Sequence, residues 1–148
     1  MPQYLQGRYS PIHPEKYLSN PTRIYYRSSL ELAFMNYLDK HPAIIGWSSE
    51  EIIVPYRDPS RGNKLHRYFP DFFFKKKDSE GKIKSVMVEI KPSSEIRPPI
   101  RKSRVTKRYI TEAYTYARND AKWTAARAYC NQRGWDFIIL TEKEILGK

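Results

Sequence analysis

The sequence is poor in cysteine, because Cys130 is the only one among 148 residues. This excludes an intrachain disulfide and any zinc site built from several cysteines, and it fits a reducing compartment. The sequence also lacks an apolar run long enough to span a bilayer, and its first residues lack the pattern of a secretory signal. We therefore expect a soluble intracellular protein with no membrane partner.

Acidic residues are scarce relative to basic ones. The chain has 27 Lys and Arg against 16 Asp and Glu, which gives a formal net charge of +11 and an isoelectric point near 9.7. A positive charge of this size predicts a polyanionic partner, and nucleic acid is the leading candidate. The alternative is a basic protein that is simply soluble or touches a membrane surface.

What is present indicates one mixed α/β domain. Hydrophobic residues make up 40% and aromatic residues 14% of the chain, which excludes a disordered protein, and 148 residues suit one core. No internal repeat or low-complexity tract is visible. We expect residues 1–148 to form one domain, in which residues 1–27 are an irregular arm packed by its aromatic side chains.

Two long segments have the apolar spacing of helices. The first is expected to start at Ser28 and end near Lys40, and the second to cover about residues 109–133, with a break near Asn119 and a cap at Gly134. A capping box at residues 141–144 predicts a short last helix. The first helix has its core spacing at Leu30, Phe34, Tyr37 and Leu38.

Strand signals lie between and after these helices. Residues 50–56, 67–75 and 83–91 are separated by segments rich in turn residues, which predicts an antiparallel meander. Residues 135–140, with the sequence WDFIIL, predict one further buried strand. The result is a mixed sheet flanked by helices.

Asp71 and Glu89 lie inside two of the most apolar runs of the chain. Burial of a carboxylate costs free energy unless a cation meets it. Strand alternation points Glu89 and Lys91 the same way, and a hairpin between the second and third strands brings Asp71 beside Glu89. Because adjacent carboxylates repel, we predict a dication between them, Mg²⁺ with Mn²⁺ as a substitute. Such a site suits phosphodiester hydrolysis.

Glu31 has two possible roles. It lies on the helical stripe of Phe34 and Leu38, so it leans toward the core and can supply a third carboxylate. However, Ser28 and Glu31 also have the spacing of a capping box, in which Glu31 only accepts a backbone hydrogen bond. The residues alone leave both roles open.

A basic, proline-rich segment, residues 92–108, directly follows Lys91. Its prolines disfavour regular structure, so we expect a flexible loop that lies along a DNA backbone. The alternative is a solvated loop without a partner. Its predicted DNA contacts are Arg97, Arg101, Lys102, Arg104, Lys107 and Arg108.

Three more polar residues are open to two interpretations. His66 lies five residues before Asp71 and could contact a phosphate or the metal, but a lone histidine at a strand edge is more often structural. Asn119 and Lys122 are three apart on the long helix, so they could face DNA or solvent.

Pro70-Asp71 followed by Glu89-Ile90-Lys91 resembles the PD-(D/E)XK nuclease motif. Taken together, six stretches resemble the head completion nucleases of tailed bacteriophages, whose core is similar to the TnsA endonuclease of transposons. These stretches are HPEKY (13–17), YRSSLELAFMNY (26–37), SEEIIVPY (49–56), HRYFPDF (66–72), EIKP (89–92) and YARNDAKWTAARAYCNQRGWDFIILTE (116–142).

This resemblance implies a restriction-endonuclease-like fold and a Mg²⁺-dependent DNA nuclease, acting as an exonuclease or an endonuclease, that serves head completion and head–tail joining and trims packaged DNA. It implies head vertex or neck proteins as partners, and action in the host cytoplasm during virion assembly or within the virion. One alternative is a noncatalytic head adaptor that binds DNA through its basic loop, and another is a resolvase or transposase subunit. The catalytic roles carried over by the resemblance fall on Glu31, Asp71, Glu89 and Lys91.

Overall fold

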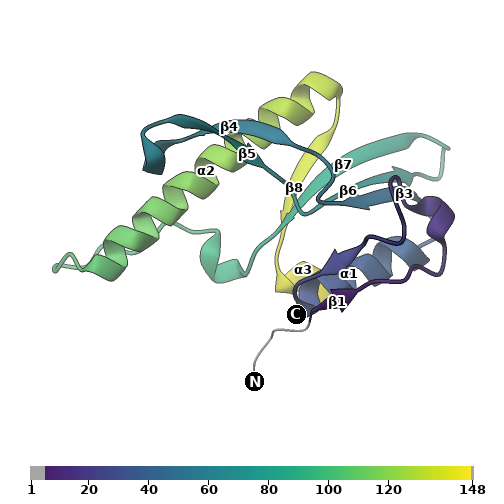
Figure 1. Ribbon diagram of the computed structural model, residues 1–148, viewed down its shortest axis with the longest axis horizontal. Coiled ribbons are helices and arrows are strands. Elements are labelled where there is room, and N and C mark those ends of the chain that lie inside the picture. The colour runs from purple at the N-terminus through teal and green to yellow at the C-terminus, as the bar shows by residue number, and fades with distance from the viewer. Residues whose placement is uncertain (1–5, 148) are drawn as a thin grey trace.

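The computed structural model describes residues 6–147, and a four-stranded mixed sheet lies at its centre (Figure 1). The strand order is β3-β6-β7-β8, in which only the β7–β8 pair is parallel. The mixed sheet flanked by helices that the sequence predicts is therefore confirmed. The strands are β3 (Ile44–Ser49), β6 (Phe72–Lys77), β7 (Ile83–Ile90) and β8 (Asp136–Leu140).

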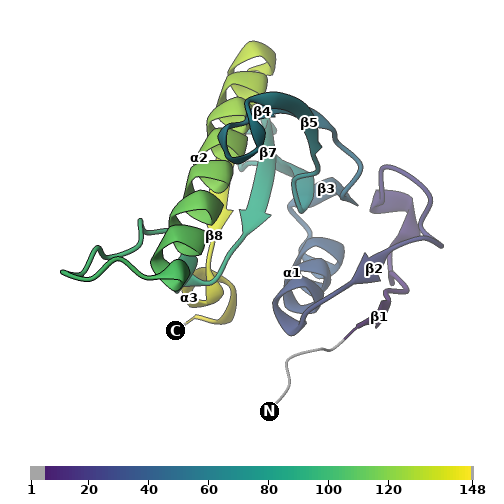
Figure 2. The same cartoon turned by 60° about the vertical axis from the view of Figure 1, so that its left-hand side comes forward.

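Helices cover both faces of this sheet (Figures 1 and 2). The long helix α2 (Lys107–Arg133) lies on one face, and α1 (Ser29–Lys40) and α3 (Glu142–Leu146) lie on the other. Alternation along β7 divides the core between the two faces, because Val88 packs with α1 whereas Met87 packs with α2. No helix in residues 6–147 is long and apolar enough to cross a membrane.

Two of the predicted strands are wrong in their bounds. Of the strand expected at 50–56, only residues 54–56 lie in a strand, β4 (Val54–Asp58), and β3 is a separate strand that the sequence does not predict. The strand expected at 67–75 is split into β5 (Lys64–Tyr68) and β6. Pro70 separates β5 from β6, since proline has no N–H for a sheet ladder. The antiparallel ribbon β4–β5 forms a sheet of its own, so β3 takes the place beside β6 that the meander gave to residues 50–56.

The predicted helix ends are mostly confirmed. Ser28 caps α1, Gly134 ends α2 with a φ of 70°, and Thr141 opens α3 with a complete capping box. However, α2 begins at Lys107 and continues through Asn119 without the expected break. Lys107 and Arg108 therefore belong to the helix and not to the basic loop. On α1, Tyr37 is 40% exposed, in contrast to its predicted core position.

The N-terminal arm has more structure than the sequence predicts, although residues 1–5 lie outside the described residues. It holds a short strand pair, β1 (Gly7–Arg8) with β2 (Tyr25–Tyr26), and a 3-10 turn at Pro14–Lys16. The buried Asp39 of α1 fixes this arm. Its carboxylate accepts hydrogen bonds from the Tyr9 hydroxyl (2.8 Å) and from the backbone N–H groups of Ile12 (2.7 Å) and His13 (2.9 Å).

We predict that Asp39→Asn lowers the free energy of unfolding by about 2 kcal/mol at pH 7, because it replaces a charged acceptor of several hydrogen bonds. Burial alone would raise the pKa of Asp39, but the bonds donated by Ile12, Tyr9 and His13 bring it below its usual value. The contribution of Asp39 is therefore lost as the pH falls below about 4. Chemical denaturation at pH 7 and pH 3.5 would measure the gap, which should narrow in acid.

The exposed Asp120→Asn of α2 is the control and should leave stability unchanged at both pH values. Equal stability of Asp39→Asn and the native protein at pH 7 would show that Asp39 does not anchor the arm.

Candidate active site

The hairpin of β6 and β7 brings Asp71 and Glu89 together. Phe72 pairs with Val88, and continuing this register by one residue sets Asp71 opposite Glu89. Lys91 follows directly after β7, and its backbone N–H donates to the carbonyl oxygen of Leu140 on β8 (3.0 Å). The carboxyl pair therefore lies at one end of the central sheet, where three strands fix its backbone.

Each carboxyl group of this pair has a specific donor. The Tyr68 hydroxyl donates to Glu89 Oε1 (2.5 Å), and Lys91 Nζ lies 3.8 Å from Glu89 Oε2. Asp71 Oδ2 accepts a hydrogen bond from the backbone N–H of Ile90 (2.7 Å). Glu89 is only 6% exposed, so these contacts replace most of its hydration.

Burial governs the electrostatics of the pair. Burial, followed by the nearby charge of Glu89, raises the pKa of Asp71 well above its usual value, although the Ile90 N–H and the Lys91 ammonium act in the opposite direction. Burial also raises the pKa of Glu89, against the hydrogen bond from Tyr68 and the charge of Lys91. Both groups therefore favour a shared proton or a bound cation.

The pair fits a hard divalent cation. Mg²⁺ takes oxygen ligands and is often held by one or two carboxylates, with water and phosphate oxygens completing its shell. Asp71 and Glu89 supply such a set of donors. Within residues 6–147, however, no group of three or more His, Cys, Asp or Glu residues is arranged to hold a metal, so the structure does not bring Glu31 into a group of three ligands.

Glu31 has features of both roles that the sequence leaves open. Its backbone N–H donates to Ser28 Oγ (3.1 Å), which is the N-cap, but its carboxylate accepts from the N–H of Arg27 (3.0 Å) and not from that of Ser28. Burial, together with the charge of Glu50, raises the pKa of Glu31. The charge of Glu31 also raises the pKa of Asp71, so Glu31 belongs to the electrostatic surroundings of the pair.

Glu50 is a strained residue beside the site. Its φ is 54°, in the left-handed region, which costs a residue with a side chain about 1–3 kcal/mol. Its N–H donates to the carbonyl oxygen of Asp71 (3.1 Å), and its carboxylate accepts from Arg27 Nη1 (3.1 Å). The turn at Glu50 therefore holds the backbone of Asp71 and the start of α1 together.

The structure adds Tyr68 and Lys122 to the site. Tyr68 was not singled out in the sequence, although it lies only three residues before Asp71. For Lys122 the sequence leaves open whether it faces DNA or solvent. Its Nζ lies 5.6 Å from the ring centroid of Tyr68, and burial, followed by the charge of Lys91, lowers its pKa. Only the folded ribbon brings Tyr68 between Lys122 and Glu89.

The remaining sequence candidates are His66 and the basic segment. His66 is on the inner face of the ribbon with its ring 6.1 Å from that of Tyr56, and it makes no hydrogen bond to Asp71 or Glu89. The basic segment leaves the site through a 3-10 turn (Ser93–Glu95), in which the N–H and hydroxyl of Ser93 donate to Glu142 (2.9 and 2.7 Å). All six predicted DNA-contacting residues are exposed: Arg97, Arg101, Lys102, Arg104, Lys107 and Arg108.

Two comparisons with known proteins bear on this site. A model of the family described as TnsA-like endonuclease N terminal matches residues 41–142, which include Asp71, Glu89 and Lys91. The chain is also 41% identical, over 140 residues, to the head completion nuclease of Enterobacteria phage T4, and the match covers 92% of this chain and 90% of that protein.

We predict that Asp71→Asn melts at the same or a higher temperature than the native protein in chelator at pH 8, because it removes one of two neighbouring charges that repel each other. Since the folded-state pKa of both carboxyl groups is raised, the native protein loses stability as the pH rises from about 4 through those values. The difference in melting temperature between Asp71→Asn and the native protein should therefore be smaller at pH 4.5 than at pH 8. A large loss of melting temperature at pH 8 would instead make Asp71 a structural residue, and Asp120→Asn is again the neutral control.

Proposed function

The chain belongs to the head completion nuclease family, which has a TnsA-like endonuclease core, and from this premise we propose that it is a Mg²⁺-dependent DNA nuclease of the PD-(D/E)XK type. The observation that carries this proposal is the pair of half-buried Asp71 and buried Glu89, with Lys91 beside it. Two neighbouring carboxyl groups with raised pKa values are costly to a fold, and they are useful where a divalent cation must be held.

The proposed roles follow from the contacts of each side chain. Asp71 and Glu89 hold Mg²⁺ or Mn²⁺, with Glu31 contributing negative charge nearby. A divalent ion at this position supplies charge neutralisation at the phosphate and lowers the pKa of a water molecule. Lys91 orients the attacking water or stabilises negative charge on the phosphate, and Tyr68 fixes the carboxylate of Glu89 through its hydroxyl.

The substrate and setting are inferred from charge and from the phage T4 relative. A net charge of +11, with exposed basic residues in the segment that follows Lys91, favours DNA as the substrate. The relative's name supports a role in head completion. We extend this role to head–tail joining and trimming of packaged DNA, with head vertex or neck proteins as partners, in the host cytoplasm during virion assembly and in the virion.

The main alternative is a noncatalytic head adaptor that has kept the nuclease scaffold and binds DNA through its basic segment. Such a protein does not need two neighbouring carboxyl groups, because changing one of them to its isosteric amide would remove their repulsion. Cleavage assays separate the two functions directly.

We predict that the native chain cleaves plasmid DNA with Mg²⁺ and not in chelator, and that Glu89→Ala lowers the cleavage rate at least about a hundredfold. Glu80→Ala is the matched control, because Glu80-Gly81-Lys82 repeats the E-x-K spacing in an exposed turn. That variant should cleave at the native rate. Cleavage that survives in Glu89→Ala would remove the assigned site, and no cleavage by the native chain on any DNA would favour the adaptor.

A second prediction concerns Glu31. If its charge assists catalysis, Glu31→Gln should lose at least about a hundredfold in cleavage rate while it still folds, because glutamine can accept the hydrogen bond from the Arg27 N–H but carries no charge. Ser28→Ala should cost about 1 kcal/mol of stability with little effect on the rate. We expect the catalytic outcome, and near-native cleavage by Glu31→Gln at saturating Mg²⁺ would reduce Glu31 to a helix cap.

A further inference from the structure

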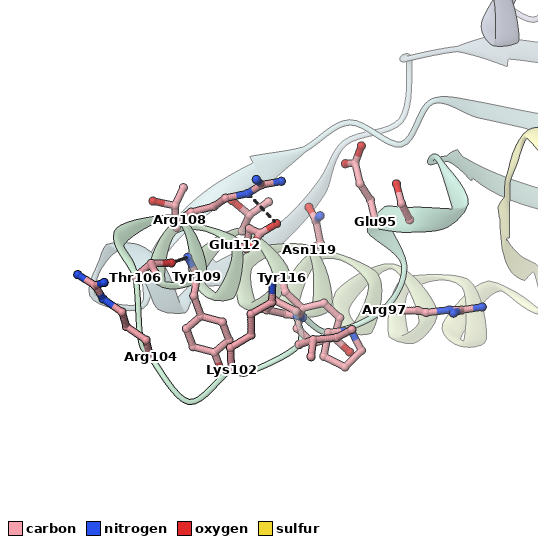
Figure 3. Close-up of a pocket in the computed structure, with 16 residues that line it drawn as sticks. Glu95, Arg97, Lys102, Arg104, Thr106, Arg108, Tyr109, Glu112, Tyr116 and Asn119 are labelled. Atoms are coloured by element: carbon pink, nitrogen blue, oxygen red, sulfur yellow. Dashed lines mark hydrogen bonds and ion pairs between the residues drawn. The ribbon is translucent and has the colours of Figure 1, made fainter.

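A groove of about 850 Å³ separates the basic segment from the first half of α2 (Figure 3). One wall is the irregular chain between the Ser93–Glu95 turn and α2, and the other is the helix surface from Tyr109 to Asn119. Figure 2 shows the irregular chain standing out beside the first turns of α2. This groove is distinct from the carboxyl pair, and neither proposed catalysis nor core packing accounts for its lining.

The lining combines cations with aromatic rings. Arg97, Lys102, Arg104 and Arg108 contribute four positive charges against Glu95 and Glu112. Glu112 lies 3.9 Å from Arg108, so one of these acidic residues is already partly neutralised. Two half-buried tyrosines, Tyr109 and Tyr116, lie seven residues apart and therefore on one side of the helix. A ligand that is both anionic and built of flat rings fits this lining.

Asn119, at the inner end of the groove, adds a polar side chain to the lining. It is only 6% exposed, yet its side-chain amide makes no hydrogen bond to another residue within 6–147. Because the amide atoms are not fully removed from water, they are accessible to a ligand that enters the groove. Figure 3 shows this amide standing out from α2 on the side of Glu95. A nucleobase or a phosphate in the groove could form a hydrogen bond with this amide.

The dimensions favour one DNA strand over two. A volume of about 850 Å³ is in the range of pockets that bury one small molecule, so it has room for about two nucleotides but not for a duplex. The groove also leads to the carboxyl pair, because Asn119 is one helical turn from Lys122, and the Ser93–Glu95 turn begins two residues after Lys91. From Tyr109 to Lys122 the helix advances about 20 Å, the length of about six nucleotides at B-form spacing.

We propose that this groove binds single-stranded DNA, with bases stacked on Tyr109 and Tyr116 and phosphates on Arg97, Lys102 and Arg104, and that it leads the strand toward the carboxyl pair. The proposal rests on the proposed nuclease function and narrows its substrate. DNA with a single-stranded end or gap is then a better substrate than blunt duplex DNA. Trimming a frayed or overhanging end is the reaction that such a groove supports.

The test measures binding in chelator, where no cleavage occurs. Fluorescence anisotropy compares an oligothymidylate of about twelve nucleotides with a blunt duplex that carries the same number of phosphates. The single strand should bind more tightly. Changing Tyr109 and Tyr116 together to Ala should weaken single-strand binding at least about tenfold, with an unchanged salt slope, whereas changing both to Phe should preserve it. Native-like single-strand binding by the double Ala variant would overturn the proposal.

A variant that cannot disturb the core provides an independent arm. Ile100 lines the groove and is 82% exposed, whereas Ile110 is 45% exposed on α2 and does not line it. Ile100→Glu and Ile110→Glu change the net charge equally. Ile100→Glu should therefore weaken single-strand binding more than Ile110→Glu only if the strand lies in the groove. We expect it to weaken single-strand binding at least about fivefold more than Ile110→Glu does, and equal effects would contradict the groove.

The two proposals fail separately. Suppose that the native chain cleaves plasmid DNA, and that the double Ala variant and Ile100→Glu still bind single strands as the native chain does. The nuclease proposal would then stand and the groove proposal would be wrong. If single-strand binding depends on Tyr109 and Tyr116 but no DNA is cleaved in Mg²⁺, the groove proposal would stand and the nuclease proposal would be wrong. Cleavage rates on blunt and overhanging duplexes then show whether the groove directs substrate choice.

Discussion

The close approach of two carboxyl groups, those of half-buried Asp71 and buried Glu89, is the constraint on which the arrangement of this protein depends. On its own the contact is unfavourable, because each charge loses its hydration and repels the other. Donors from several elements offset this cost: the backbone N–H of Ile90 on β7, the hydroxyl of Tyr68 on β5 and the ammonium of Lys91 after β7. The ribbon, the central sheet and the chain beyond it must therefore all be in place before the pair can be held.

The ribbon β4–β5 is attached to the rest of the molecule by another buried charge. Asp58, which is fully buried, accepts hydrogen bonds from Arg118 Nε on α2 (3.1 Å) and from the N–H of Ser60 (2.9 Å). This contact fixes the ribbon on the helix that also carries Lys122. Tyr68 thus approaches Glu89 from one element while Lys122 covers the ring of Tyr68 from another. The site is assembled at the junction of ribbon and helix, which explains why the ribbon leaves the central sheet.

Sequence reasoning succeeded where the signal is local. The caps at Ser28, Thr141 and Gly134 and the neighbouring positions of Asp71 and Glu89 follow from spacing within a few turns or within one hairpin. The resemblance to head completion nucleases is confirmed by the comparisons.

The failures of sequence reasoning have long-range causes. Strand β3 was missed because Gly46 and the two serines that follow Trp47 weaken its pattern, although Trp47 is fully buried. The left-handed turn at Glu50 separates β3 from β4, and no residue type in that stretch predicts this turn. Tyr68 gains its role only through a contact 21 residues away along the chain. The groove likewise exists only when the basic segment lies beside α2, which no local pattern predicts.

The two faces of the central sheet therefore differ in the kind of residue that they bury. The face under α1 is packed by aromatic rings, with Phe34 5.1 Å from Phe72, and it holds the anchored N-terminal arm. The face under α2 accepts the polar residues, including Glu89, Lys122 and Asn119. Because β6 and β7 are shared by both faces, the apolar packing under α1 limits the movement of the carboxyl pair on the other side. A rigid apolar layer is thus the physical condition for keeping two repelling carboxyl groups close together.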